Sequence, residues 1–483
     1  MMNAAAPKSR PSRAAILIGV TLGIVILVNL ISRQWLGVIV NDQAEQVVYS
    51  QDWRLVYDEQ MPVYQWMTNI LLRLTDYWVL TQDLVKYIWL ILTAVCLYRL
   101  GQRMSGAATG GALAVLFAFL LPTVNEDLLR EYSHSAALIA FTVMSMLYFV
   151  KEGRERPRFE TWAPGLALIW ALGIYAKHSM MIFIAAEIAA FAWLFRPRWP
   201  ELRSLITTAG AALLAALPIY LIIAFHQTVV AEGVEEFMGE GSPMARFRGL
   251  TDFAGSLPAE GALLFLACGI GYLFARGKAG TTVDQNTRLI FWMNVATVLL
   301  FVLGVVISNA SVFRDRWLSP ALILFAPVAA RWFIFGLKAR TARILAVSLS
   351  VVLLIIGFER AAEPLLNRGS GKIDTENLPL RAIARAVGEV RDPGEIVVAA
   401  NQSVAGTIKM MRPDLIVYSP WTIENLAEDA DDILLVTTQK PSIKPLNFPD
   451  ESWSCETPHE FYLPYHLVTE GTFRFELSHC RKG

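Results

Sequence analysis

Hydrophobic residues along this chain are gathered into long runs, and short polar segments separate the runs. A helix needs roughly 20 mostly apolar residues to cross about 30 Å of hydrocarbon. Eleven runs reach or approach that length, so the pattern predicts a multi-pass α-helical membrane protein. The predicted spans are 14–32, 82–100, 106–124, 134–151, 162–177, 178–196, 205–225, 259–275, 287–308, 318–335 and 341–358.

Two of these spans need a comment. The runs within 162–196 are short for two full crossings, so we expect a tight helical hairpin there. The first run has no A-x-A-like cleavage site after it, which favours a retained helix over a secretory signal peptide.

Basic residues in the loops predict the orientation. Lys and Arg collect on the cytoplasmic side of short loops. With eleven spans, every strongly basic segment falls on the side of the N-terminus. We therefore expect the N-terminus in the cytoplasm of an inner-membrane protein, and the odd number of spans sends the tail to the periplasmic or extracellular side. The basic segments are 8–13, 99–103, 151–158, 196–203, 276–288 and 338–343.

The last part of the chain, residues 359–483, loses the membrane composition. The helical pattern LRAIARAVGEV is followed by the apolar stretches EIVVAA, LIVYS and ILLVTT, with AGTIKMM between the first two. This alternation predicts a small α/β domain. We expect a transmembrane domain over 1–358 and a soluble extracytoplasmic domain over 359–483.

The four cysteines fit this division. Cys96 and Cys268 lie inside predicted membrane helices, where they are expected to be small buried apolar residues. Cys455 and Cys480 lie in the tail, in an oxidising compartment if the orientation is right, and we expect a disulfide between them. The formal net charge of the chain is zero, which indicates no nucleic-acid partner.

The first outer loop holds a cluster of acids directly after the first span, in NDQAEQVVYSQDWRLVYDEQMP at 41–62. Asp42 and Glu45 are three residues apart and share one helix face, opposite Ala44, Val47 and Val48. We expect these carboxylates to point away from lipid, into a cavity that the loop covers. The acids of the cluster are Asp42, Glu45, Asp52, Asp58 and Glu59.

A second amphipathic segment follows at 62–75. Its apolar residues recur at the spacing i, i+3, i+4, i+7 and i+8, which predicts a helix lying in the membrane interface. The apolar stripe is Val63, Trp66, Met67, Ile70 and Leu71, and the opposite face carries Tyr64, Gln65, Thr68, Asn69 and Arg73.

Basic and polar residues gather on the same side, in the other outward loops. Charged groups at membrane depth are costly unless they face a cavity or each other, so they suggest a functional site. Taken singly, each has an ordinary alternative as a solvated or helix-end residue, and Lys177 as a lysine that extends to the interface. Their occurrence together favours a site. These residues are Arg130, Glu131, His134, Lys177, His178, Arg314, Asp315 and Arg316.

Several short motifs resemble the polyprenyl-phosphate-sugar-dependent C-type glycosyltransferases, the superfamily of protein O-mannosyltransferases and lipid A aminoarabinose transferases. The resemblance covers about 14–335. Gln43 stands where relatives carry an acid, which leaves Asp42 as the strongest carboxylate of the first motif. The motifs are DQAE at 42–45, YDEQMP at 57–62 with Trp66, REYSHSAALIA at 130–140, AKHSMM at 176–181 and DRWLSPAL at 315–322.

This resemblance implies an inverting transfer of a sugar from a polyprenyl phosphate to an envelope acceptor on the outer face of the inner membrane. The acceptor is lipid A, another glycan or a protein hydroxyl. An attacking hydroxyl needs a general base, and the leaving phosphate needs cations. Asp42 is the expected base, Asp58 a second catalytic acid group, and Lys177, Arg314 and Arg316 the phosphate-binding residues.

The sequence also leaves open a bound metal, other protein classes and further site residues. A divalent metal beside the carboxylates stays open, because no ligand spacing requires one. The other classes to consider are a secondary transporter and a non-catalytic scaffold; the first usually has midplane ion sites and internal repeats, and neither is seen here. The further site candidates are Glu45, Glu59, Arg130, His134 and His178.

Overall fold

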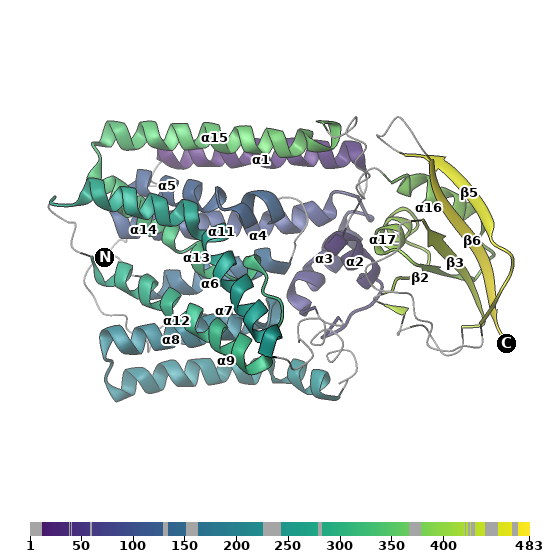
Figure 1. The fold of residues 1–483 in the computed structure, drawn as a ribbon, viewed down its shortest axis with the longest axis horizontal. Coiled ribbons are helices and arrows are strands. Elements are labelled where there is room, and N and C mark those ends of the chain that lie inside the picture. Colours follow the sequence, from purple (N-terminus) through teal and green to yellow (C-terminus); the bar gives the residue numbers. More distant parts are fainter. Residues whose placement is uncertain are drawn as a thin grey trace, which may run out of the picture.

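The structure is a computed structural model, and the description below concerns the following residues: 12–37, 39, 41–57, 60–128, 134–150, 163–225, 243–278, 283–366, 378–420, 422, 423, 426, 430–439, 453–465 and 472–483. A bundle of apolar helices forms most of the molecule, and a small sheet domain lies at one end of it (Figure 1).

Helices account for most of the described residues up to position 366. They are α1 (Arg13–Leu36), α2 (Asn41–Tyr49), α3 (Pro62–Leu74), α4 (Thr81–Ser105), α5 (Ala108–Phe119), the π-helix η1 (Thr123–Leu128), α6 (His134–Phe149), α7 (Ala163–Ala176), α8 (Met180–Phe195), α9 (Trp199–Phe225), α11 (Pro243–Ala275), α12 (Gln285–Ser308), the 3-10 turn η3 (Asp315–Trp317), α13 (Ser319–Leu322), α14 (Phe325–Gly336) and α15 (Ala339–Leu366).

Seven helical stretches within the described residues are long and apolar enough to cross a membrane, and α5, α6, α7 and α8 are shorter apolar helices. Each predicted span overlaps one of these stretches, which confirms a multi-pass helical membrane protein. The number of crossings stays a prediction. The hairpin expected at 162–196 is confirmed as α7 and α8, joined at 177–179.

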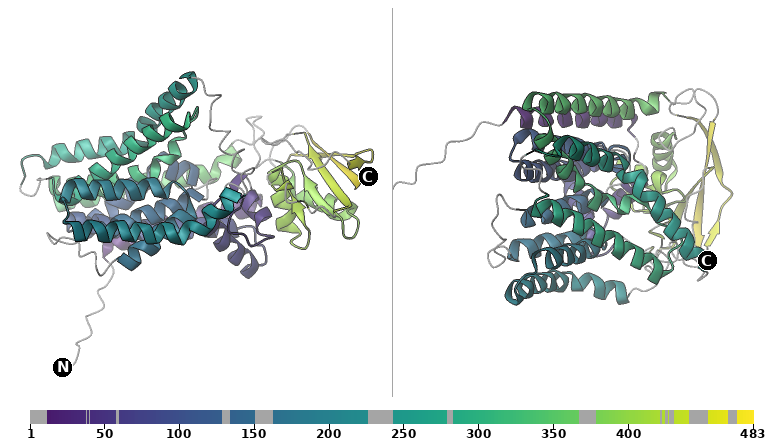
Figure 2. Two further views of the ribbon diagram at one scale, coloured as in Figure 1. Left: turned by 90° about the horizontal axis from the view of Figure 1, so that it is seen from below. Right: turned by 60° about the vertical axis from the view of Figure 1, so that its left-hand side comes forward.

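The two ends of the helix bundle carry different parts of the chain. The start of α1 lies at one end of the bundle, and the C-terminal domain lies at the other (Figure 1). This arrangement agrees with an odd number of crossings. The short helices α2 and α3 of the first loop lie between the bundle and the C-terminal domain, as the views in Figures 1 and 2 both show.

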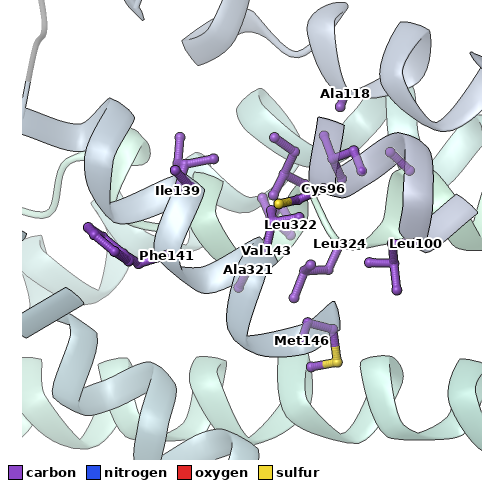
Figure 3. Packing of buried hydrophobic residues seen from close by; sticks show 14 of the residues in the cluster. Cys96, Leu100, Ala118, Ile139, Phe141, Val143, Met146, Ala321, Leu322 and Leu324 are labelled. Atoms are coloured by element: carbon purple, nitrogen blue, oxygen red, sulfur yellow. The ribbon is translucent and has the colours of Figure 1, made fainter. Parts of the chain in front are cut away.

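The core of the bundle is built from small and branched side chains of α4, α5, α6 and the segment 319–324 (Figure 3). Cys96, Val143 and Leu322 are among the residues that meet there. Gly111 allows α5 to approach α4 closely, because a Cβ there would lie 2.6 Å from the Tyr98 carbonyl oxygen. Small residues permit such close helix contacts, on which helix association inside a membrane depends.

The C-terminal domain is an α/β unit, as predicted. Its sheet has the order β2-β1-β3-β6-β4, and β5 also pairs with β6. The central pairs β1–β2 and β1–β3 are parallel, whereas β6 is antiparallel to its neighbours. The elements are α16 (Leu380–Val390), β1 (Ile396–Ala399), α17 (Gln402–Met411), β2 (Val417–Tyr418), β3 (Asp432–Thr438), β4 (Trp453–Cys455), β5 (His459–Pro464) and β6 (Thr472–Lys482).

All four cysteine expectations are confirmed. Cys455 and Cys480 face each other on the antiparallel strands β4 and β6 and form a disulfide, with their Cα atoms 4.0 Å apart. Cys96 in α4 and Cys268 in α11 are buried free thiols.

The C-terminal domain contacts the first loop through specific residues. Helix α17 packs against α2 so closely that a Cβ on Gly406 would lie 2.5 Å from the Ala44 Cα. The Gln51 side chain extends the edge of β2: its Nε2 donates to the Val417 carbonyl (2.7 Å), and its Oε1 accepts from the Val417 N–H (2.9 Å). The domain is therefore anchored to the loop that carries the acidic cluster.

Candidate active site

Helix α2 presents the first two carboxylates. Asp42 lies in its first turn, where a negative charge is stabilised by the helix dipole. Asp42 and Glu45 are half-buried, while Ala44, Val47 and Val48 on the other face are almost fully buried. The apolar face packs against the C-terminal domain, because Val48 belongs to that domain's hydrophobic core. The two faces of α2 are thus divided as the sequence predicted.

Helix α3 turns its polar face inward. It begins with Pro62 at its first position, where a missing N–H is harmless. Gln65, Thr68 and Asn69 are fully buried, whereas Ile70 on the apolar stripe is 49% exposed. This inversion of the usual pattern is expected for a helix whose outer face meets lipid and whose inner face lines a polar site.

Lys177 lies near charged residues of two other segments, α2 and the stretch at 314–316. It follows α7 directly, and its Nζ donates to the Ser135 hydroxyl at 3.2 Å. Burial, together with Arg316 and Arg314, lowers the pKa of Lys177 to about 8, and the nearby Asp42 partly opposes this shift. Asp42, Arg314 and Arg316 therefore each lie within electrostatic reach of Lys177.

A set of neutral polar groups borders this charge cluster. Gln46 on α2 contacts the His134 ring of α6, with Nε2 atoms 3.2 Å apart, and Gln65 donates to the Gln46 carbonyl at 2.8 Å. Within the described residues, Gln46 Oε1, Gln65 Oε1, Thr68 Oγ1 and His134 Nδ1 are buried without hydrogen-bond partners. Buried polar atoms in native proteins are nearly always satisfied, so such a concentration is typical of a surface that binds a polar ligand.

The chain is similar in sequence to several known proteins. Residues 59–223 match a family described as dolichyl-phosphate-mannose-protein mannosyltransferase. The chain is 24% identical over 397 residues to the lipopolysaccharide core galacturonosyltransferase RgtA of Rhizobium johnstonii, which covers 78% of this chain and 77% of RgtA. It is also 24% identical over 388 residues to RgtB of the same organism, with the same coverage.

The fold has solved counterparts as well. The crystal structure of ArnT from Cupriavidus metallidurans bound to undecaprenyl phosphate matches with a TM-score of 0.59 at 10% identity, over 96% of this chain and 98% of that one. The apo structure gives a TM-score of 0.61. The family match, the two relatives and the fold together support the C-type glycosyltransferase superfamily. The predicted enzyme class, a glycosyltransferase that uses a lipid-linked sugar, is therefore confirmed over a transporter or a scaffold.

The structure also places some of the other residues that the sequence predicted for the site. His134 is buried beside Gln46 and Tyr64. His178 turns toward Tyr220, with Nδ1 3.3 Å from the hydroxyl, and burial and Lys177 lower its pKa to about 4, so the ring is neutral at pH 7. The predicted residues Asp58, Glu59, Arg130 and Glu131 lie outside the described residues.

Tyr57, the first residue of the YDEQMP motif at 57–62, has a structural role. Its side chain is fully buried, its hydroxyl donates to the Asp52 carbonyl at 3.0 Å, and that hydroxyl accepts from the Arg54 N–H at 3.0 Å. Trp66 Nε1 donates to the Arg54 carbonyl at 2.8 Å, and the Trp66 ring contacts Tyr175 of α7. These residues fasten the first loop to the helix that ends beside Lys177.

A buried ion pair below α2 was missed by the sequence analysis. Lys86 Nζ lies 3.1 Å from Asp83 Oδ1, and both side chains are almost fully buried at the start of α4. Gln43, next to Asp42, donates to the same Asp83 oxygen at 2.9 Å. Since breaking a buried pair leaves an uncompensated charge, this network holds α2 firmly on α4. The only sequence signal was an Asp–Lys pair inside an otherwise apolar run.

Metal binding beside Asp42 stays open. The one group of His, Asp and Glu side chains among the described residues that is close enough to share an ion is Asp392, Glu395 and His479, in the C-terminal domain.

Proposed function

We propose that this glycosyltransferase transfers one sugar, with inversion, from a polyprenyl phosphate to a glycolipid acceptor on the outer face of the inner membrane. The observation that carries the proposal is that Lys177 lies within electrostatic reach of Asp42, Arg314 and Arg316. A carboxylate beside a group of cations is what an attacking hydroxyl and a leaving phosphate require.

In the proposed step, the acceptor hydroxyl oxygen attacks the anomeric carbon and forms the new glycosidic bond. Asp42 takes the hydroxyl proton as the bond between the anomeric carbon and the phosphate oxygen breaks. The polyprenyl phosphate leaves with the electron pair of that bond. Lys177, Arg314 and Arg316 stabilise its growing charge by charge-assisted hydrogen bonds.

The neutral polar groups beside the cations suit the sugar. Gln46, Gln65 and Thr68 offer buried amide and hydroxyl oxygens that accept hydrogen bonds from sugar hydroxyls, and His134 Nδ1 adds a nitrogen. A site built to bind hydroxyl groups rejects analogues that lack them, because its own polar atoms are then left unpaired.

The relatives suggest the substrates. RgtA and RgtB are lipopolysaccharide core galacturonosyltransferases, so we assign galacturonic acid as the sugar and the lipopolysaccharide core as the acceptor.

The test is an assay with the purified full chain in detergent. Polyprenyl-phosphate-linked galacturonic acid and the matching galactose donor are each supplied with lipopolysaccharide, and the acceptor mass is followed by mass spectrometry. The proposal expects the mass of one galacturonic acid to be added and little transfer of galactose. Preferential transfer of galactose would refute the assigned sugar, and no transfer from either donor would refute the proposed donor and acceptor.

A further inference from the structure

A cavity that contains none of the proposed catalytic residues is lined by the C-terminal domain, the first loop and the end of α1. Its volume is about 280 Å³, near the lower end of the roughly 300–1,000 Å³ usual for small-ligand pockets. Gly37, Trp78 and Met410 contribute to its wall, together with Arg381, Arg385 and Thr407.

Two arginines give this cavity a positive charge. Arg381 and Arg385 are four residues apart on the exposed face of α16, whose other face, with Ile383 and Val387, is buried in the domain core. Arg381 Nε donates to the Gly37 carbonyl at 2.9 Å, which places its guanidinium at the end of α1. Neither arginine forms an ion pair with a described residue. Arginine is the residue best suited to bind phosphate through several N–H groups at once.

A buried hydroxyl independently indicates a polar ligand. Thr407 lines the cavity and is only 2% exposed. Its Oγ1 has no hydrogen-bond partner among the residues that the structure describes. An unsatisfied buried hydroxyl costs about 1–3 kcal/mol, so a ligand that pairs with it is favoured.

The surroundings indicate that the ligand is a lipid. Leu27, Ile31 and Trp35 are exposed apolar side chains four residues apart, so they form a stripe along α1 that ends two residues before Gly37. Trp78, in the cavity wall, is 44% exposed. Tryptophan is enriched at the level of lipid headgroups, where its ring suits both water and acyl chains. An acyl chain along this stripe would have its headgroup at the cavity.

We propose that this cavity binds the phosphate of an anionic phospholipid, in the leaflet on the side of the C-terminal domain. Arg381 and Arg385 hold the phosphate oxygens, and the Thr407 hydroxyl donates to one of them. Thr407 lies on α17, one residue from Gly406, which packs against Ala44 of α2. The bound lipid therefore fastens α17, and through it the helix that carries Asp42, to the membrane surface.

The test is a titration of the purified full chain in a non-ionic detergent. Phosphatidylglycerol, phosphatidylcholine and inorganic phosphate are added separately, and the thermal midpoint is followed. We expect phosphatidylglycerol to raise the midpoint and the other two to have little effect. An equal rise with inorganic phosphate would show a site for soluble anions, and no rise with phosphatidylglycerol would show no lipid site. Either result overturns the proposal.

Three variants locate the effect. Arg385→Gln should weaken the apparent affinity for phosphatidylglycerol about 10- to 100-fold, as expected for a lost charged hydrogen bond. Thr407→Val should weaken it about 2- to 10-fold, without lowering stability in the absence of lipid, because the hydroxyl has no partner to lose among the described residues. The matched control is Arg481→Gln, which removes the same charge from an exposed pair with Asp432.

The affinities of the variants decide whether the lipid binds at this cavity. The proposal requires Arg481→Gln to keep wild-type affinity while Arg385→Gln loses it. Equal losses in both would mean that the lipid responds to overall charge. Wild-type affinity in both Arg385→Gln and Thr407→Val would place the lipid elsewhere.

Discussion

The most specific prediction concerns the pH dependence of donor use, which follows from the surroundings of Lys177. Burial and the neighbouring Arg316 lower the pKa of this amine from its ordinary value near 10.5 to about 8. Only the ammonium form binds a phosphate strongly, and the amine is an ammonium below its pKa. Donor binding is therefore strong below about pH 8 and weakens above it.

The expected size of the effect follows from the titration itself. Above the pKa, the ammonium fraction falls about tenfold for each pH unit, so about a tenth remains at pH 9 and about a hundredth at pH 10. The kcat/KM for the donor reports groups of the free enzyme, and it should fall along this curve. The kcat at saturating donor should fall later, because a bound phosphate raises the pKa of the amine.

The Lys177→Arg variant tests whether deprotonation of Lys177 causes the fall in donor use above pH 8. A guanidinium stays charged throughout the accessible range, so the fall near pH 8 should disappear, even if the altered shape lowers the activity at every pH. The assay measures initial rates of transfer at low donor concentration between about pH 6 and about pH 10. A wild-type profile that stays flat through pH 9, or an unchanged fall near pH 8 in Lys177→Arg, would refute the reasoning.

Two further predictions concern the C-terminal domain. Gly406→Ala should force α17 away from α2, because the added Cβ would meet Ala44, and it should destabilise the protein by about 1–3 kcal/mol and slow transfer. Gly255→Ala, with open space around it in α11, is the control, and equal thermal midpoints for the two variants would contradict the close packing. Replacing both Cys455 and Cys480 by Ser should cost the domain about 3–4 kcal/mol in denaturant unfolding, given their sequence separation of 25 residues. No difference between oxidised wild type and this variant would contradict the stabilising role.

Much of the fold could be predicted because long apolar runs carry a strong signal. The start of α11 was missed, since its first turns, from Pro243 to Leu257, are too polar for the hydropathy pattern of a span. In the tail, β1 and β3 are buried apolar strands and were found, whereas β5 was not. Strand β5 is largely exposed and mixes charged with aromatic residues, so it carries no clear period.

The candidate site was only partly predictable. Charged residues at predicted helix ends can be assigned to one side of the membrane, and this brought Asp42 and Lys177 into one hypothesis. Gln46 was not named, and Gln65 was placed only on the polar face of a helix, because neutral amides in a loop are ordinarily solvated. Only the packing of α2, α3 and α6 shows that both side chains are buried. The contact between Gly406 and Ala44 joins segments far apart in the chain, so no local pattern indicates it.

The measurement that tests the central claim most directly is the transfer rate of Asp42→Asn, compared with Glu45→Gln on the same helix face. Asparagine keeps the size of the side chain and removes its basicity, and loss of a general base costs about 100- to 10,000-fold in rate. We predict such a loss for Asp42→Asn, with an unchanged thermal midpoint, and a much smaller effect for Glu45→Gln. Turnover by Asp42→Asn close to that of the wild type would contradict the assignment of Asp42 as the base.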